Sequence, residues 1–189
     1  MIRKNDWRPF QVQDIFEVLN GKGITKQEIG EHLGDLPAIQ SGEKNNGVVG
    51  YIDQEYCEQM KYTYSLEPCL TVARTGSAGY VTFQPQGCCV GDSAKILKPR
   101  EALTTESFLF FRTLFMANKY RYTYARKVTE ANYKSEIIEL PVTKDGKPDY
   151  ELAIKQHDDY IAALKSCNVE VTILEADERY PDSCFVEDT

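Results

Sequence analysis

The sequence predicts an α+β protein with a mixed β-sheet, a buried core helix and a second helix near the C-terminus. Three observations support this class. Short apolar runs separated by Asn-Gly or glycine-rich turns are typical of β-hairpins. A stretch that begins at Thr105 is apolar on nearly every side, as core helices are. A later stretch, from Tyr150, repeats its apolar residues with 4-3-4-3 spacing.

The first 33 residues predict a strand and two short helical segments. The opening "WRPFQVQDIFEVLN" alternates around Phe10 and Val12, which indicates a short strand. Thr25 and Glu28 have the spacing of a capping box, which predicts a helix over residues 26–33. Between them, a helical turn is indicated by the apolar residues Ile15, Phe16 and Leu19.

A β-hairpin is predicted over "LPAIQSGEKNNGVVGYI". Apolar runs at residues 36–40 and 48–52 flank a polar tip that contains Asn46-Gly47, a strong hairpin signal. The same tip carries Lys44 and Asn45. Further along the chain, a strand is expected over residues 94–98.

The stretch "VARTGSAGYVTFQ" resembles a phosphate-cradling glycine loop at first sight. However, a P-loop needs Gly-Lys-Ser/Thr and then a helix, whereas Gly79 is followed by β-branched and aromatic residues. We therefore expect a hairpin, with strands at residues 69–73 and 80–84 around a tight turn at 74–79. Nucleotide binding stays as a weaker alternative.

Two helices are predicted in the second half. The first, from Thr105, is interrupted only by Arg112 and is expected in the core. The second, over residues 150–165, can be N-capped by Asp149. Its apolar stripe suits contact with one partner surface and consists of Tyr150, Ile154, His157, Ile161 and Leu164. Two more strands are expected at residues 137–140 and 169–174, before an acidic tail.

Charge is distributed unevenly along the chain. The formal net charge of -7 divides into -3 for residues 1–89, +5 for residues 90–134 and -9 for residues 135–189. The basic part interleaves tyrosines with Lys119, Arg121, Tyr122, Arg126 and Lys127. Lysine and arginine bind phosphates, and tyrosine stacks on bases or sugars. This composition favours nucleic-acid binding, although ordinary surface strands can also have it.

The composition predicts one domain of ordinary size. Hydrophobic residues make up 42% of the 189 residues, and no apolar run approaches the roughly 20 residues that cross a bilayer. The N-terminus also lacks the apolar segment of a signal peptide. We therefore expect a cytoplasmic protein without membrane contact.

Residues for metal or nucleophilic chemistry are few. None of the six cysteines forms a Cys-x-x-Cys pair, and only His32 and His157 are available. We expect reduced, mostly buried thiols, no metal and no cofactor. No motif identifies a catalytic residue, so we expect no enzymatic activity. A small metal-dependent hydrolase stays open, since scattered carboxylates can meet in space.

Five motifs in order carry a resemblance to a known family: "WRPFQVQDIFEVLNGKGIT", "LPAIQSGEKNNGVVGYI", "LTVARTGSAGYVTFQP", "CCVGDSAKILKP" and "ANYKSEIIELPVTKDGKPDYE". The sequence resembles the target recognition domain of type I restriction-modification specificity subunits and of type IIG and BcgI-like relatives. The resemblance spans residues 7 to about 165. It implies the mixed-sheet fold of that domain, followed by a spacer-like helix.

The resemblance implies a sequence-specific reader of double-stranded DNA that directs methyltransferase and nuclease subunits. It divides the chain into a recognition domain, residues 1–143, and a spacer-like helix with an acidic C-terminal segment, residues 144–189. The implied partner-binding residues are those of the apolar stripe. The implied DNA-binding residues are Lys44, Asn45, Asn46, Arg74, Ser77, Tyr80, Lys119, Arg121, Tyr122, Arg126 and Lys127.

The chain also departs from the family pattern. Complete specificity subunits carry two recognition domains and two long helices, whereas this sequence has one domain and a short helix that is followed by an acidic strand and tail. Three interpretations fit this departure: a half-subunit that forms a homodimer, a domain fragment, or a stand-alone relative. Two alternative functions stay open. One is the small hydrolase, and the other is a partner-binding module on the same scaffold that does not bind DNA.

Overall fold

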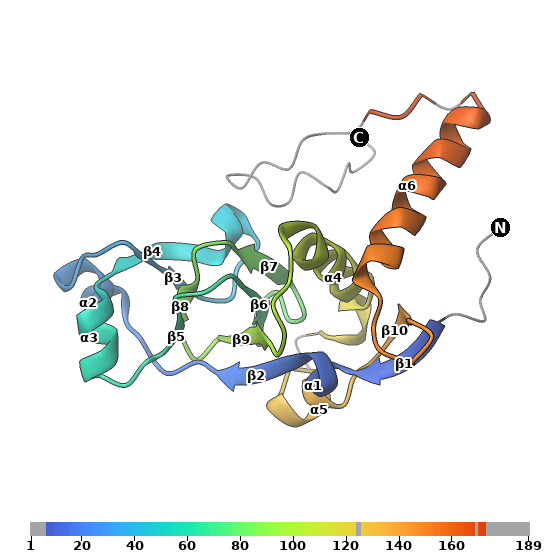
Figure 1. Ribbon diagram of the computed structural model, residues 1–189. Coiled ribbons are helices and arrows are strands. Elements are labelled where there is room, and N and C mark those ends of the chain that lie inside the picture. The colour runs from blue at the N-terminus through green and yellow to red at the C-terminus, as the bar shows by residue number, and fades with distance from the viewer. Residues whose placement is uncertain (1–6, 124–125, 169, 173–189) are drawn as a thin grey trace.

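The computed structural model describes residues 7–123, 126–168 and 170–172 and confirms the α+β class with a mixed sheet (Figure 1). The strands are β1 Trp7–Gln11, β2 Phe16–Asn20, β3 Leu36–Ile39, β4 Val48–Ile52, β5 Thr63–Ser65, β6 Cys69–Ala73, β7 Val81–Gln84, β8 Cys88–Val90, β9 Ala94–Pro99 and β10 Ile137–Pro141. The α-helices are α1 Val12–Ile15, α2 Lys26–Glu31, α3 Gln54–Gln59, α4 Thr105–Ala117, α5 Glu130–Lys134 and α6 Tyr150–Ser166. Two 3₁₀ turns cover Lys44–Gly47 and Lys119–Arg121.

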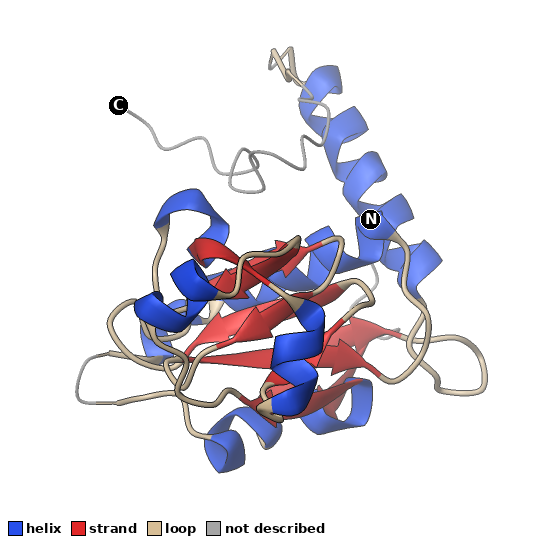
Figure 2. Cartoon of the chain, turned by 90° about the vertical axis from the view of Figure 1, so that its left-hand side faces the viewer, coloured by secondary structure: helices blue, strands red, loops and turns tan. Residues whose placement is uncertain are grey.

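The strands of the described residues form three sheets. A central antiparallel sheet has the order β2-β9-β6-β7, and β1 pairs antiparallel with β10. The third sheet, β4-β3-β8-β5, is mixed, because β3 and β8 run parallel and its other pairs are antiparallel. Helices surround these sheets, and α6 projects away from them (Figures 1 and 2).

Helix α4 is the core helix that the sequence predicts. Phe108, Phe111 and Phe115 are buried, and the Phe111 ring meets Phe16 of β2 edge-on at 4.9 Å between centroids. The helix begins at Thr105, and Thr104 caps it by accepting a hydrogen bond from the Ser107 amide. Burial of these rings fixes α4 against the central sheet.

Both predicted hairpins are confirmed. Strands β3 and β4 pair with Leu36 opposite Ile52, and strands β6 and β7 pair with Cys69 opposite Gln84. The capping box of Thr25 with Glu28 at the start of α2 is also present. Four of the five cysteines that the structure describes are buried free thiols, and Cys167 is the exposed one.

Two local predictions need correction. Phe16 and Leu19 lie on strand β2 and not in a helical turn, which ends at Ile15. Pairing of β2 with β9 decides this, because it sets Phe16 opposite Pro99 and buries alternate residues. Of the strand predicted at residues 169–174, residues 170–172 are described and form no strand. Its other residues and the acidic tail after it lie outside the described residues.

Candidate nucleic-acid interface

The turn RTGSAG is a tight hairpin turn at the end of β6. The Ala73 amide donates to the Tyr80 carbonyl at 2.8 Å, and the Gly79 amide donates to the Ala73 carbonyl at 2.9 Å. Gly76 and Gly79 adopt positive φ angles of 63° and 83°, which side chains with a Cβ rarely adopt. The hairpin interpretation of this motif is therefore confirmed. Arg74, at the start of the turn, is exposed.

The basic segment, of which the structure describes residues 119–123 and 126–127, lies directly against this turn. A Cβ added to Gly79 would come within 2.8 Å of the Tyr122 ring, so only glycine allows this approach. The Val128 amide donates to the Arg74 carbonyl at 3.2 Å, and the Lys119 ammonium lies 5.0 Å from the centroid of the Tyr80 ring. The fold thus joins two motifs that are about 45 residues apart in the sequence.

The tip of the β3–β4 hairpin meets the same two segments. Lys119 forms a 2.6 Å ion pair with Glu43 of the tip, and Ser77 of the turn also bonds that carboxylate. The hydrogen bond from Lys119 is the main reason that the pKa of Glu43 is lowered from its usual value. One carboxylate therefore links all three predicted DNA-binding segments.

The amides of the tip are used inside the protein. Asn46 Nδ2 donates to the Phe83 carbonyl at 2.7 Å, and Asn45 Nδ2 donates to the Val48 carbonyl at 3.1 Å. Both residues have positive φ, which asparagine tolerates better than most residues. The Asn46 bond anchors the tip on β7, the Asn45 bond closes the tip onto β4, and Lys44 is exposed beside them.

Arg121 and Tyr122 are tied to a buried carboxylate. The Tyr122 hydroxyl donates to Glu136, and Arg121 Nη1 lies 3.4 Å from the same carboxylate, whose side chain is 4% exposed. Burial raises the pKa of Glu136 above its usual value, although these two partners act in the opposite direction. Both residues therefore hold the basic segment on the body of the protein.

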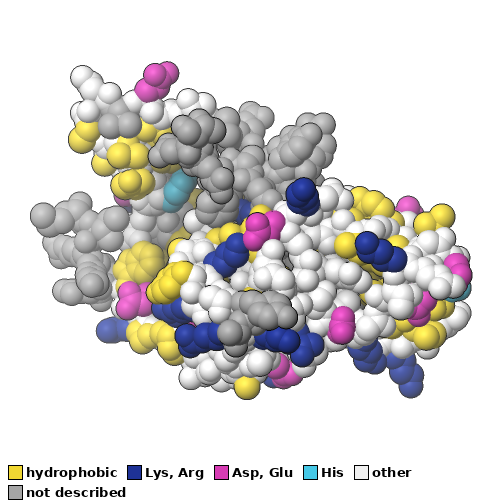
Figure 3. Space-filling view, turned by 180° about the vertical axis from the view of Figure 1, so that it is seen from behind, with side chains coloured by type: hydrophobic (Ala, Val, Ile, Leu, Met, Phe, Trp, Pro, Cys, Tyr) yellow, Lys and Arg dark blue, Asp and Glu magenta, His cyan; other side chains and the backbone are white. Residues whose placement is uncertain are grey.

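The remaining predicted cations face solvent. Lys44, Arg74, Arg126 and Lys127 are all exposed. Viewed from behind, lysine and arginine side chains form a broken band across this side of the molecule (Figure 3). Such a band can contact several phosphates along a nucleic-acid backbone.

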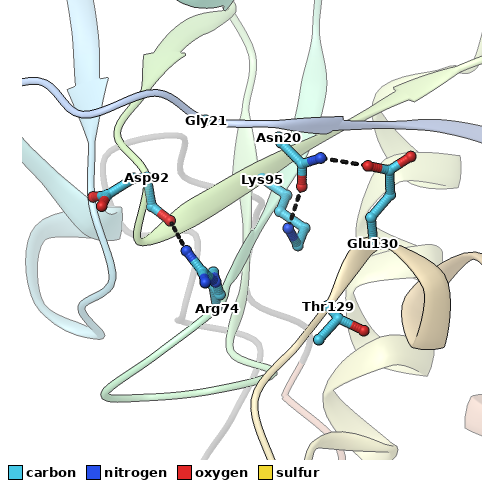
Figure 4. A pocket seen from close by; sticks show the side chains of 7 residues that line it. All are labelled: Asn20, Gly21, Arg74, Asp92, Lys95, Thr129 and Glu130. Atoms are coloured by element: carbon cyan, nitrogen blue, oxygen red, sulfur yellow. Dashed lines mark hydrogen bonds between the residues drawn. The ribbon is translucent and has the colours of Figure 1, made fainter.

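A pocket of about 320 Å³ adjoins this surface (Figure 4). Sequence analysis missed it except for Arg74, because Lys95 lies within the apolar strand "AKILKP" and Glu130 starts a short helix. The sequence signal that could have indicated the pocket is Lys95 itself, a lysine at an inward-facing position of a predicted strand. The pocket is lined by Asn20, Gly21, Arg74, Asp92, Lys95, Thr129 and Glu130.

The predicted partner stripe runs along α6. Its first residue, Tyr150, packs its ring against Phe111 of α4 at 5.5 Å, so this residue fastens the helix to the core. His157 is exposed beside Asp158, whose carboxylate lies 3.5 Å from Nδ1. Beyond its first turns the helix leaves the body (Figure 1). The other members of the stripe are half-buried: Ile154, Ile161 and Leu164.

The described residues contain neither a candidate metal cluster nor a membrane-spanning helix. No group of three or more His, Cys, Asp and Glu residues there could hold a metal ion. Within the same residues, no helix is long and apolar enough to cross a membrane.

The fold is that of the specificity subunits of type I restriction-modification systems. The chain superposes on the S subunit of the type I system from M. genitalium with a TM-score of 0.57 at 16% sequence identity, over 88% of this chain and 43% of that one. The sequence itself matches the type I restriction modification DNA specificity domain family over residues 4–172. The chain belongs to this family.

A curated relative gives the same assignment at low identity. The specificity subunit S.BcgI of a type II restriction enzyme from Heyndrickxia coagulans is 27% identical over 146 residues. The aligned part is 77% of this chain but 40% of that subunit. The chain thus spans less than half the length of this relative.

A short segment is similar to a different class of protein. Over 43 residues the chain is 60% identical to an N(G),N(G)-dimethylarginine dimethylaminohydrolase of Pseudomonas aeruginosa. This segment is 23% of the chain and 17% of that enzyme. This similarity covers a small part of both proteins, whereas the match to the specificity domain covers residues 4–172.

Proposed function

We propose that the chain recognises a specific DNA sequence as a specificity subunit, or half-subunit, of a restriction-modification system. The observation that carries this proposal is the meeting of three separate segments on one face. Each of the three contributes an exposed cation, and Glu43 with Lys119 joins the hairpin tip to the basic segment. Cations around loops can hold a DNA backbone while the loops read base edges in a groove.

The family membership supports the same role. A specificity component has no catalysis of its own and acts by directing methyltransferase and nuclease partners. In this proposal, residues 1–143 contact the DNA and residues 144–189 contact partners. The stripe on α6 then serves those subunits or a second copy of the chain, and the protein works in the cytoplasm.

Tyr150 is the least suited of the proposed partner-binding residues, since it already packs on Phe111. The exposed part of α6, beyond the first turn, is better placed for contact with another helix. Ile154, Ile161 and Leu164 lie on that part and retain exposed surface. Apolar residues at this spacing suit a helix partner.

Charge reversal at exposed positions tests DNA binding. Lys44→Glu with Lys127→Glu changes two of the solvent-facing cations, whereas reversal at Arg121 would set two carboxylates together at Glu136. Lys155→Glu with Lys165→Glu on α6 makes the same charge change away from the three segments. The affinity of each double variant for a labelled 20-base-pair duplex of mixed sequence is measured by fluorescence anisotropy from 50 to 200 mM NaCl.

We expect the first double variant to lose two phosphate contacts. The slope of log K against log salt then falls by about 1.8, and affinity at 50 mM salt falls roughly a hundredfold. The α6 variant should bind as the unmodified protein does. Equal binding by all three proteins would contradict the proposed surface, and no binding by any of them would favour a partner-binding module on the same scaffold.

A further inference from the structure

The pocket of Figure 4 contains a buried lysine near the start of β9, an interior strand of the central sheet. Lys95 is 3% exposed and lies on β9, directly opposite Asn20 of β2 and Val72 of β6. Its side chain lies on the same sheet face as the core residue Leu97. A lysine at such a position is rare unless it is paired.

Lys95 has only a neutral partner. Its ammonium donates to Asn20 Oδ1, and no carboxylate of the described residues lies within 4.0 Å of it. Burial is the main cause that lowers the pKa of Lys95, and the positive charge of Arg74 adds to it. An ammonium that has lost water and faces a second cation is stabilised by an incoming anion.

Of the two acidic residues that line the pocket, Glu130 interacts with Lys95 through its charge, which opposes the lowering of the lysine pKa, but it does not bond the ammonium. Glu130 accepts from the Asn20 amide with one oxygen and from Lys134 with the other. The Asp92 carboxylate points away from the pocket, and it is the carbonyl of this residue that accepts from Arg74, at 3.2 Å (Figure 4). Two cations, Arg74 and Lys95, therefore face one carboxylate, that of Glu130, and both oxygens of that carboxylate already accept hydrogen bonds.

We infer that Arg74 and Lys95 together hold one phosphate group of the DNA backbone in this pocket. The inference rests on the proposed DNA binding and assigns a particular site to it. A lysine on β9 and an arginine directly after β6 suit an anion with several oxygens, because each can bond a different oxygen. Thr129 adds a hydroxyl at the rim of the pocket, and its oxygen accepts from the Asn132 amide, which leaves its proton free to donate.

The position of the pocket favours a phosphodiester over a small free anion. Arg74 belongs both to the pocket and to the turn that meets the basic segment, through its carbonyl bond to the Val128 amide. A backbone that follows the exposed cations Arg126 and Lys127 would therefore pass the opening. A phosphate seated in the pocket also fixes the register of the duplex on the domain.

Lys95→Met tests the inference, with Lys98→Met as its matched control. Both lysines lie on β9, but Lys98 lies on the opposite face and pairs with Glu67 at 3.0 Å. Methionine fills the space of Lys95 without a buried charge, so the variant should fold, which a thermal melt checks. Arg74→Met, at an exposed position, gives a second variant that does not depend on the core.

The full chain and its variants are titrated with the 20-base-pair mixed-sequence duplex at several salt concentrations. We expect Lys95→Met and Arg74→Met each to weaken binding roughly tenfold at 50 mM salt. If both cations hold the same phosphate, the double variant should lower the salt slope by about 0.9 in total. Loss of two separate phosphates would lower it by about 1.8. Lys98→Met should leave both quantities unchanged.

Other outcomes overturn the inference. If the unmodified chain binds the duplex and Lys95→Met binds equally well, the pocket holds no phosphate of the DNA while the proposed function stands. If the unmodified chain does not bind the duplex, both fail. If inorganic phosphate raises the melting temperature of the unmodified chain but not of Lys95→Met, while duplex binding is unaffected by the substitution, the pocket serves a free anion.

Discussion

Asn46 anchors the tip of the β3–β4 hairpin, and its replacement should destabilise the protein. Its Nδ2 donates at 2.7 Å to the carbonyl of Phe83, a residue that is 3% exposed. Removal of this donor leaves a buried carbonyl unpaired, which costs about 2 kcal/mol. The φ angle of 52° adds about 1 kcal/mol for alanine. We therefore expect Asn46→Ala to lower the free energy of unfolding by about 3 kcal/mol.

Urea unfolding followed by circular dichroism measures this effect. With a slope of about 2 kcal/mol per molar urea, the midpoint of Asn46→Ala should fall by about 1.5 M. Asn46→Gly separates the two contributions, since glycine accepts the positive φ, and its midpoint should fall by about 1 M. Midpoints within 0.2 M of the unmodified protein for both variants, together with lost DNA affinity, would refute the anchoring role and restore Asn46 as a base reader.

Three further predictions concern other parts of the fold. Gly79→Ala should cost about 2 kcal/mol or more, because its φ is 83° and the new Cβ would lie 2.8 Å from the Tyr122 ring; an unchanged melting temperature would show that the turn is not held there. The pKa of Glu28 is lowered to about 2, chiefly by its hydrogen bond with Thr25. The contribution of Glu28 to stability is therefore present above its unfolded pKa and is lost as the pH falls toward 2. The melting temperature of Glu28→Gln should consequently depend less on pH between 5 and 2 than that of the unmodified protein. Tyr150→Ala should lower stability by about 2 kcal/mol through loss of the contact with Phe111, and a thermal melt without change would assign Tyr150 to a partner surface instead.

Local signals explain what could be predicted from the sequence. The glycines of RTGSAG, the capping pair of Thr25 with Glu28 and the phenylalanines of α4 act within a few residues of chain. Their structures therefore follow from turn chemistry, capping and periodicity. By contrast, the five residues of β2 fit both a helical and a strand period, and only pairing with β9 separates the two.

The chemistry of the interface depended on contacts between distant parts of the chain. Lys95 meets Asn20 across 75 residues, and Lys119 meets Glu43 across 76 residues. No periodicity encodes such pairs. Asparagine amides suit adenine, and the fold uses the amides of Asn45 and Asn46 to close the tip. Whether a polar side chain faces solvent or the protein is thus decided by tertiary packing.

Selection from a randomised duplex library tests the central claim most directly. The full chain is incubated with the library at low salt, alone and with a methyltransferase subunit encoded beside it, and the retained DNA is sequenced. The account predicts enrichment of one sequence motif, which Lys44→Glu with Lys127→Glu weakens. Retained DNA without any enriched motif, or no retained DNA from a folded protein in either format, would contradict sequence-specific recognition.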